Sequence, residues 1–178
     1  MQKTEEKQPL NKKLARTKRL AKLKRVPPFP GTKQSNKFTI VYAVDTSGSM
    51  SNRDLQLGLS ELQQIQKSDS DVTILVMYSD AALAHEYKIG ATDKIDFSVK
   101  GRGGTDFEPV FERVLELMRS SEDAPDVLIY ATDGYAPPPS IRLSIPVVWL
   151  ITPTGIPVCT DAGHITLKMQ DFASGEDS

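Results

Sequence analysis

The sequence has few of the residues that form covalent cross-links and transition-metal sites. Among its 178 residues there is one cysteine, Cys159, and there are two histidines, His85 and His164. A lone cysteine excludes an internal disulfide framework and gives no zinc motif. A chain without disulfides suits a reducing compartment, so the sequence predicts a cytoplasmic protein.

Long apolar segments are also missing. No run reaches the roughly 18 residues that a transmembrane helix requires, and no apolar segment near the N-terminus has the form of a secretory signal. The hydrophobic content of 39% is ordinary for a globular domain, and 178 residues are enough to bury one core. We therefore expect a single soluble domain that has no membrane partner.

The charges are unevenly distributed along the chain. Residues 1–37 contain 12 Lys and Arg but only 2 Asp and Glu, whereas residues 38–178 contain 10 and 21. We predict a basic arm with a Pro-rich linker over 1–37, a folded domain over 38–170 and a loose tail over 171–178. Three roles stay open for residues 10–25, which are partly helical in pattern. They can rest on the acidic domain as a solvated tail, bind nucleic acid, or dock on an acidic protein.

Segments with the pattern of buried strands alternate with segments that have one apolar face, as helices do. This alternation predicts an α/β fold, a doubly wound, mostly parallel sheet with helices on both faces, as in Rossmann-like proteins. Segment 92–97 is either irregular or a short helix, and 153–163 has too much Pro, Gly and Thr for a helix. The predicted strands are 38–44, 71–78, 83–89 at an edge, 126–132, 145–152 and 165–168, and the predicted helices are 51–66 and 106–120.

Oxygen-bearing side chains follow the ends of two predicted strands and a glycine pair. Asp45 ends the first apolar run, and Ser47 and Ser49 follow it at alternate positions, while Thr105 follows two glycines and Asp133 ends a later strand. Because the carboxyl ends of parallel strands meet at one edge of a sheet, these loops are expected to converge. Carboxylates and hydroxyls are ligands for a hard cation such as Mg²⁺.

The ordered set Asp45-x-Ser47-x-Ser49, Thr105 and Asp133 resembles the metal-ion-dependent adhesion site of von Willebrand factor A (VWA) domains. The stretches 102–107, 125–126, 130–135 and 146–149 resemble one bacterial subgroup, the VWA-like domain found C-terminal to a metallopeptidase-like domain. The similarity covers roughly residues 30–167. A short basic arm precedes the domain here, so no function of the metallopeptidase-like half is carried over.

The resemblance implies that hydroxyls of Ser47, Ser49 and Thr105 bind the ion directly, and that Asp45 and Asp133 bind it directly or through water. It implies Mg²⁺, with Mn²⁺ or Ca²⁺ as alternatives. Neutral hydroxyls leave the charge of the cation poorly neutralised, and an octahedral ion then keeps a position open for a Glu or Asp of a partner protein. The predicted function is a metal-dependent adaptor, for which family analogy suggests a MoxR-type AAA+ ATPase as partner.

Asp106, beside Thr105, has two open roles: it either orients a metal ligand or water, or it caps the following helix. Each motif taken alone is also compatible with an ordinary turn or cap, and a degenerate site that binds no metal stays open. Tyr135 and the prolines at 137–139 are candidates for one wall of the binding edge.

Two other functions compete with the adaptor. A Mg²⁺-dependent hydrolase is disfavoured, because Ser47 stands where haloacid dehalogenase-like enzymes have a second aspartate, and because no P-loop or Gly-x-Ser-x-Gly motif is present. We therefore predict that the chain is not an enzyme. A nucleic-acid-associated protein that uses residues 10–25 is the other alternative, and it is compatible with the adaptor.

Overall fold

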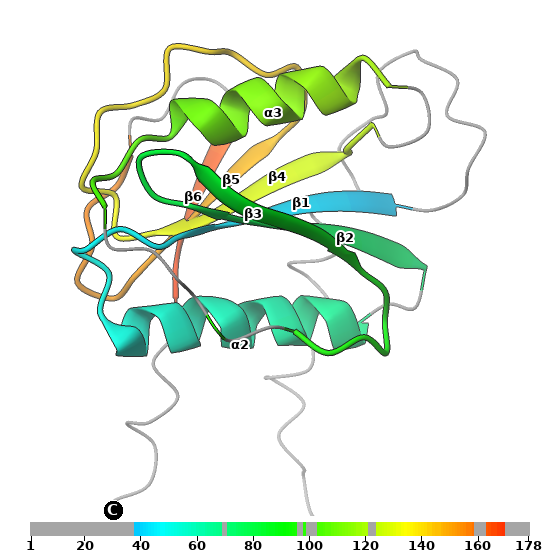
Figure 1. The fold of residues 1–178 in the computed structure, drawn as a ribbon, viewed down its shortest axis with the longest axis horizontal. Helices are drawn as coiled ribbons and strands as arrows, with labels where there is room; N and C mark the ends of the chain where they lie inside the picture. Colours follow the sequence, from blue (N-terminus) through cyan, green and yellow to red (C-terminus); the bar gives the residue numbers. More distant parts are fainter. Residues whose placement is uncertain are drawn as a thin grey trace, which may run out of the picture. The chain divides into compact units, whose positions relative to one another are not determined.

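The structure is a computed structural model that describes residues 38–68, 71–95, 98, 103–120, 124–158 and 163–169 (Figure 1). The basic arm and linker predicted over 1–37 lie outside these residues. So do the tail predicted over 171–178 and the single cysteine.

Six strands form one sheet in the order β3-β2-β1-β4-β5-β6. All neighbouring pairs are parallel except β2 and β3, so the antiparallel strand lies at the edge, where the polar pattern of 83–89 predicted it. The strand order runs outward from β1 and β4, which form the switch point where α/β sheets of this kind bind ligands. The strands are β1 Phe38–Asp45, β2 Val72–Ser79, β3 Leu83–Ile89, β4 Val127–Thr132, β5 Val147–Ile151 and β6 His164–Lys168.

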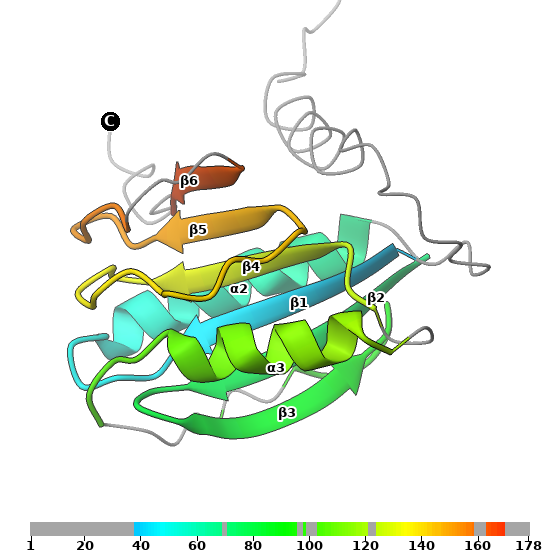
Figure 2. The ribbon, with the colours of Figure 1, turned by 90° about the horizontal axis from the view of Figure 1, so that it is seen from above.

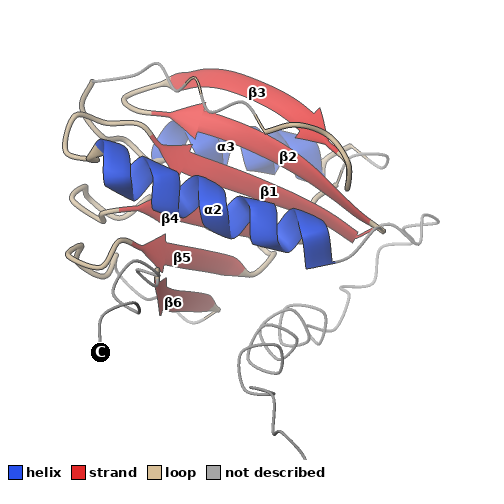
Figure 3. Cartoon of the chain, turned by 90° about the horizontal axis from the view of Figure 1, so that it is seen from below, coloured by secondary structure: helices blue, strands red, loops and turns tan. Residues whose placement is uncertain are grey.

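One helix covers each face of the sheet, which confirms the predicted doubly wound α/β architecture. Helix α2 (Asn52–Ser68) lies along β1 and β4 on one face (Figure 3), and α3 (Glu108–Met118) lies on the opposite face (Figures 1 and 2). Ser51 and Asp54 start α2 by bonding reciprocally, because each side chain accepts the backbone N–H of the other at 3.1 Å. The Tyr42 hydroxyl of β1 then donates to the Gly58 carbonyl of α2 at 2.6 Å.

The core under α3 is aromatic. Trp149 of β5 is fully buried, and its ring centroid lies 5.0 Å from that of Phe107, 5.8 Å from that of Phe111 and 5.4 Å from that of Tyr130. Offset and edge-to-face packing of this kind stabilises by about 0.5–1.5 kcal/mol per pair beyond the area buried. The cluster holds α3 over β4 and β5, at a fixed distance from the carboxyl ends of those strands.

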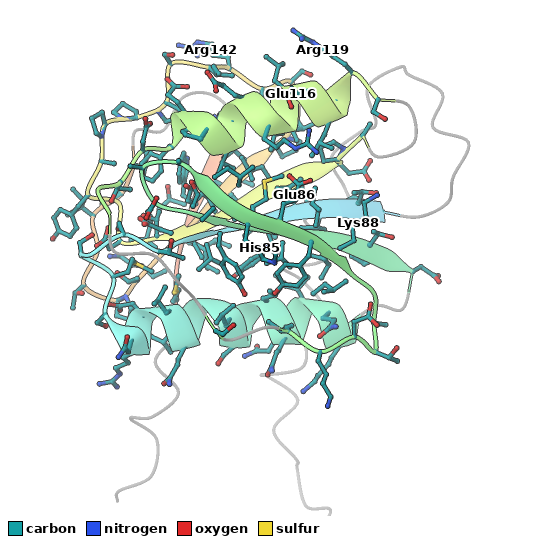
Figure 4. All side chains as sticks on the ribbon, viewed as in Figure 1. His85, Glu86, Lys88, Glu116, Arg119 and Arg142 are labelled. Carbon is teal, nitrogen blue, oxygen red and sulfur yellow. The ribbon has the colours of Figure 1, made fainter. Side chains whose placement is uncertain are left out.

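A polar clamp joins the edge strand β3 to α3. The guanidinium of Arg113 donates to both carboxylate oxygens of Glu86, from Nε at 2.8 Å and from Nη2 at 2.9 Å. The same guanidinium donates from Nη1 to Glu116 at 2.9 Å, and Figure 4 labels Glu86 on β3 and Glu116 on α3. This bidentate pair fixes the antiparallel hairpin against the helix.

The connections contain less helix than an ordinary doubly wound fold. Residues 92–95 form turns and irregular structure, not the short helix left open for 92–97, whose last two residues are not described. The 133–146 link between β4 and β5 has no helix, and its apolar side chains Ala136, Ile141, Leu143 and Ile145 pack on the core instead. None of the described helices is both long and apolar enough to cross a membrane.

Candidate metal site at the carboxyl edge of the sheet

The loops that carry the predicted ligands meet at one end of the sheet, where the arrows of β1 and β4 point (Figure 2). Backbone hydrogen bonds tie these loops together. Thr46 N–H donates to the Ser79 carbonyl at 2.8 Å, and Gly48 N–H donates to the Gly103 carbonyl at 3.0 Å. The turn after β1 is therefore attached both to the end of β2 and to the glycine loop before α3.

Asp45 is fully buried at the end of β1, and donors on two strands hold its carboxylate. Ser47 N–H donates to Oδ1 at 2.9 Å, and the hydroxyl of Thr132 donates to Oδ2 at 2.6 Å. Burial raises the pKa of this carboxyl, and the charge of Asp133 raises it further, while the hydrogen bonds from Ser47 and Thr132 oppose the rise. The ion pairs of the described residues do not include Asp45, so an ionised Asp45 has no cationic partner in that part of the chain.

The two serine hydroxyls are spaced like neighbouring ligands of one small cation. Ser47 is buried, Ser49 is exposed, and their Oγ atoms lie 3.1 Å apart. An octahedral Mg²⁺ with oxygen ligands at about 2.0–2.1 Å has neighbouring ligands about 2.9 Å apart. Since Ca²⁺ has longer bonds of about 2.3–2.6 Å, its ligands in the same arrangement would be about 3.3–3.7 Å apart. The observed 3.1 Å lies between the two values, so this spacing suits one small cation with oxygen ligands and does not separate Mg²⁺ from Ca²⁺.

The other two predicted ligands lie on the adjoining loops. Asp133 is buried directly after β4, and its Oδ1 accepts the N–H of Tyr135 at 3.1 Å. The residue before it, Thr132, donates to the carboxylate of Asp45, so Asp133 directly follows the contact between the two strands. Thr105 is half-buried in the glycine loop and makes no hydrogen bond to the other four residues. The structure thus brings Asp45, Ser47 and Ser49 into one cluster, with Asp133 close by and Thr105 on the attached loop.

Asp106 accepts a hydrogen bond from the first residue of α3. Its Oδ1 accepts the N–H of Glu108, the first residue of that helix, at 3.0 Å, and its own N–H donates to the Asp80 carbonyl at 3.0 Å. The contact with Glu108 satisfies one free N–H at the helix start, while the N-cap position itself is Phe107, which has no side-chain cap. A role in orienting a metal ligand stays a prediction.

Two residues that support the site were not singled out in the sequence. Thr132 holds Asp45, as described above, and its Oγ1 also accepts Gly134 N–H at 3.0 Å. Asp80 accepts Gly103 N–H at 3.2 Å, and a Cβ on Gly103 would lie only 2.9 Å from the Asp80 carboxylate. Asp80 follows β2 as Asp45 ends β1, so the same strand-end signal would have found it. Thr132 could be identified only from the sheet register, which places it beside the end of β1.

Three buried hydroxyls near this edge have no hydrogen-bond partner among the described residues: those of Thr46, Tyr130 and Thr152. Burial, and then the charge of Asp45, raise the pKa of the Tyr130 hydroxyl. Ser79 is close enough to oppose that rise, but the two hydroxyls do not meet in hydrogen-bond geometry, and Ser79 donates to the Ala82 carbonyl at 3.1 Å. Unpaired buried hydroxyls of this kind are suited to hold water or a ligand.

Comparison with known proteins identifies the family. The model of the family described as "VWA-like domain (DUF2201)" matches residues 40–161, which is more than half of the chain. The comparison with curated proteins gives no match. Among solved structures, the chain is similar to the ArnB paralog VWA2 from Sulfolobus acidocaldarius, with a TM-score of 0.49 and 16% identity over 65% of this chain. It spans 34% of that structure's chain, about a third of its length. The chain belongs to the VWA-like domain family (DUF2201), as its strand-end motifs predicted.

Proposed function

We propose that this chain is a metal-dependent protein-interaction domain that binds a carboxylate of its partner through Mg²⁺. VWA-like domains commonly mediate protein interactions, and the metal dependence is the specific part of the proposal. One observation carries it: a fully buried carboxylate that has no cationic partner among the described residues stands beside two hydroxyls whose spacing fits an octahedral ion.

The ion would be held by Asp45, Ser47, Ser49, Thr105 and Asp133. When bound, Mg²⁺ would neutralise the buried carboxylates and offer a remaining position to an oxygen from outside. The chain's own residues prepare the site, because Ser47 N–H and the Thr132 hydroxyl fix both oxygens of Asp45 before any ion arrives. Mn²⁺ and Ca²⁺ are alternative ions, because both also bind oxygen ligands.

We assign the site to binding and not to catalysis. Ser47 and Ser49 bond each other, and both oxygens of Asp45 accept hydrogen bonds that hold the carboxylate in place. These contacts suit a rigid ion site, and they do not set up a free nucleophile beside a general base. The nucleic-acid alternative rests on residues 10–25, which lie outside the described residues, and it stays a prediction.

Calorimetric titration of Mg²⁺ tests the proposal directly. The informative variant is Ser47→Ala, and the matched control is Ser60→Ala, which removes the same atom from a helix serine whose hydroxyl only donates to the Gln56 carbonyl. We expect binding heat and a higher melting temperature for the wild type and the control, and neither for Ser47→Ala. Absence of binding by the wild type, or equal binding by all three proteins, would refute the metal site.

The partner needs a second experiment. Family analogy makes a MoxR-type AAA+ ATPase the first protein to test, in the presence of Mg²⁺ and again with EDTA. Binding that requires Mg²⁺ and is lost in Ser47→Ala would support the adaptor function. Binding that persists in EDTA would show that the metal site does not mediate the interaction.

A further inference from the structure

Two exposed apolar side chains lie at the metal edge. Within the described residues three large hydrophobic side chains are exposed: Tyr135 at 57%, Ile156 at 44% and Ile165 at 40%. Tyr135 lies in the loop after β4 and Ile156 in the loop after β5, both at the carboxyl end of the sheet (Figure 2). Single exposed hydrophobics need no explanation, but neighbouring ones mark contact surfaces.

Backbone contacts bring Tyr135 and Ile156 to the same candidate ligand. Tyr135 N–H donates to the carboxylate of Asp133 at 3.1 Å, and Ile156 N–H donates to the Asp133 carbonyl at 2.8 Å. Gly134 lies between them with φ of 81°, and a Cβ at this position would collide with the Ile156 carbonyl. Two segments that are distant in the sequence therefore meet at Asp133, and each carries an exposed apolar side chain.

Hydrogen bonds within the loop and from Lys168 fix the loop that carries Ile156. Gly155 N–H donates to the Thr152 carbonyl at 3.1 Å, which closes a tight turn. The ammonium of Lys168, at the end of β6, donates to the carbonyls of Thr152 at 3.3 Å and Pro153 at 3.4 Å, and also to that of Gly155. A loop fixed in this way loses little conformational entropy when a partner binds.

The two sides of the site differ in charge. Residues 134–141 and 152–157 contain no charged side chain, and their prolines 137, 138, 153 and 157 are exposed. On the β2 side, by contrast, Asp80 and Asp106 add carboxylates beside the glycine loop. A partner that places one carboxylate on the ion would therefore meet an apolar surface on the β4–β5 side and negative charge on the other side.

We propose that Tyr135 and Ile156 form an apolar shelf that selects the partner of the metal site. The occupant is an exposed protein segment in which an apolar side chain lies within two residues of the Glu or Asp that reaches the ion. A second acidic residue next to that Glu or Asp is disfavoured where it faces Asp80 and Asp106, because like charges repel. This inference rests on the proposed metal-dependent binding and adds the chemistry of the partner.

The test is a displayed library of random nonapeptides with a fixed central Glu, bound in Mg²⁺ and released with EDTA. It compares the wild type, the Tyr135→Ser/Ile156→Ser double variant, and Ile165→Ser as a control with an equally exposed isoleucine away from this edge. The double variant keeps the backbone hydrogen bonds to Asp133, so calorimetry should show unchanged Mg²⁺ binding in all three proteins.

We expect the wild type and the control to enrich peptides with an apolar residue within two positions of the Glu, and the double variant to lose that enrichment. A selected peptide should bind the double variant about tenfold more weakly, which corresponds to about 1.4 kcal/mol. Recovery without an apolar bias, the same bias in the double variant, or no recovery by a protein that binds Mg²⁺ would overturn the shelf. A wild type that binds no Mg²⁺ would overturn the proposed function instead.

Discussion

Replacing Asp45 by asparagine should stabilise the metal-free protein and abolish its stabilisation by Mg²⁺. The carboxylate is fully buried, and burial together with the charge of Asp133 raises its pKa. Folding therefore shifts this group toward its neutral form relative to the unfolded chain. Asp45→Asn mimics that neutral form with almost the same shape, so it separates the electrostatic cost of the site from its packing.

The size of the effect follows from opposing contributions at this position. Burying one ion destabilises the folded state by several kcal/mol. The hydrogen bonds from Ser47 and Thr132 each stabilise it by about 1.5–3 kcal/mol, because the acceptor is charged. Asparagine can still accept from Ser47 N–H, but its amide nitrogen cannot accept from the Thr132 hydroxyl. We expect the variant to be more stable than the wild type in EDTA by an amount on the order of 1 kcal/mol.

Mg²⁺ should invert this order. A ligand that binds only the folded state stabilises it by about 2.7 kcal/mol at a free concentration one hundred times its Kd. The wild type should gain this stability, and the variant should gain none. Urea unfolding at pH 7.5, in EDTA and in saturating MgCl₂, measures both differences.

The dependence on pH supplies an internal control in EDTA. Because the pKa of Asp45 is raised on folding, its contribution is fully present below the unfolded pKa and is lost as pH rises through the folded pKa. The wild type should thus approach the stability of Asp45→Asn in acid and fall below it at neutral pH. A variant that is less stable than the wild type in EDTA at neutral pH, or that gains equally from Mg²⁺, would refute the reasoning.

Three further substitutions have defined outcomes. Tyr130→Phe should raise the urea midpoint in EDTA by the equivalent of about 1 kcal/mol, because it removes a buried hydroxyl that has no hydrogen-bond partner among the described residues. A lower midpoint would show that the hydroxyl is bonded to water. Gly134→Ala should lower the unfolding free energy by about 2 kcal/mol or more, because φ is 81° at this position and a Cβ would collide with the backbone. The control Gly104→Ala should have almost the same melting temperature as the wild type, because no atom lies within 4 Å of the added Cβ. Glu86→Gln should lower the unfolding free energy by about 0.5–1 kcal/mol at pH 7, because its ion pair with Arg113 is partly exposed. The hydrogen bonds from Arg113 lower the pKa of Glu86, so this loss of stability should disappear as pH falls through that pKa. A difference in unfolding free energy that does not change with pH would contradict the clamp.

Local patterns predicted the elements of the fold because burial on one or two faces leaves a clear period in the sequence. The apolar runs that end at Asp45 and before Asp133 marked two strands and also the edge where their loops meet. Helix α3 begins at Glu108 and not at the predicted 106, because Asp106 uses its side chain outside the helix to accept the Glu108 N–H. This hydrogen bond locates the start of α3, whereas the spacing of apolar residues predicts a helix end only to within about two residues.

The contacts that complete the site are tertiary, and the local sequence does not encode them. Ile156 lies in a Pro-rich segment that looked only like a loop, and it reaches Asp133 through one backbone hydrogen bond and through the space that Gly134 leaves open. Thr132 is one residue before a predicted ligand, yet its partner Asp45 is 87 positions away. Both contacts follow from strand register and loop packing, so they become visible only when the sheet is assembled.

The distribution of charge at the edge explains why an ion would be needed at all. Lys168 lies at the end of β6 and reaches the loop next to Asp133, but in the described part of the chain its ammonium contacts three carbonyl oxygens. Lys168 therefore supports the loop of Ile156 and does not pair with Asp45 or Asp133 among the described contacts. The negative charge of Asp133 raises the pKa of Asp45. A cation between these carboxylates would remove that repulsion, and the neutral serines beside them would keep part of its charge available. The same arrangement that raises the pKa of Asp45 in the metal-free site would thus, under the proposed function, make a metal-bound site attractive to an acidic side chain from outside.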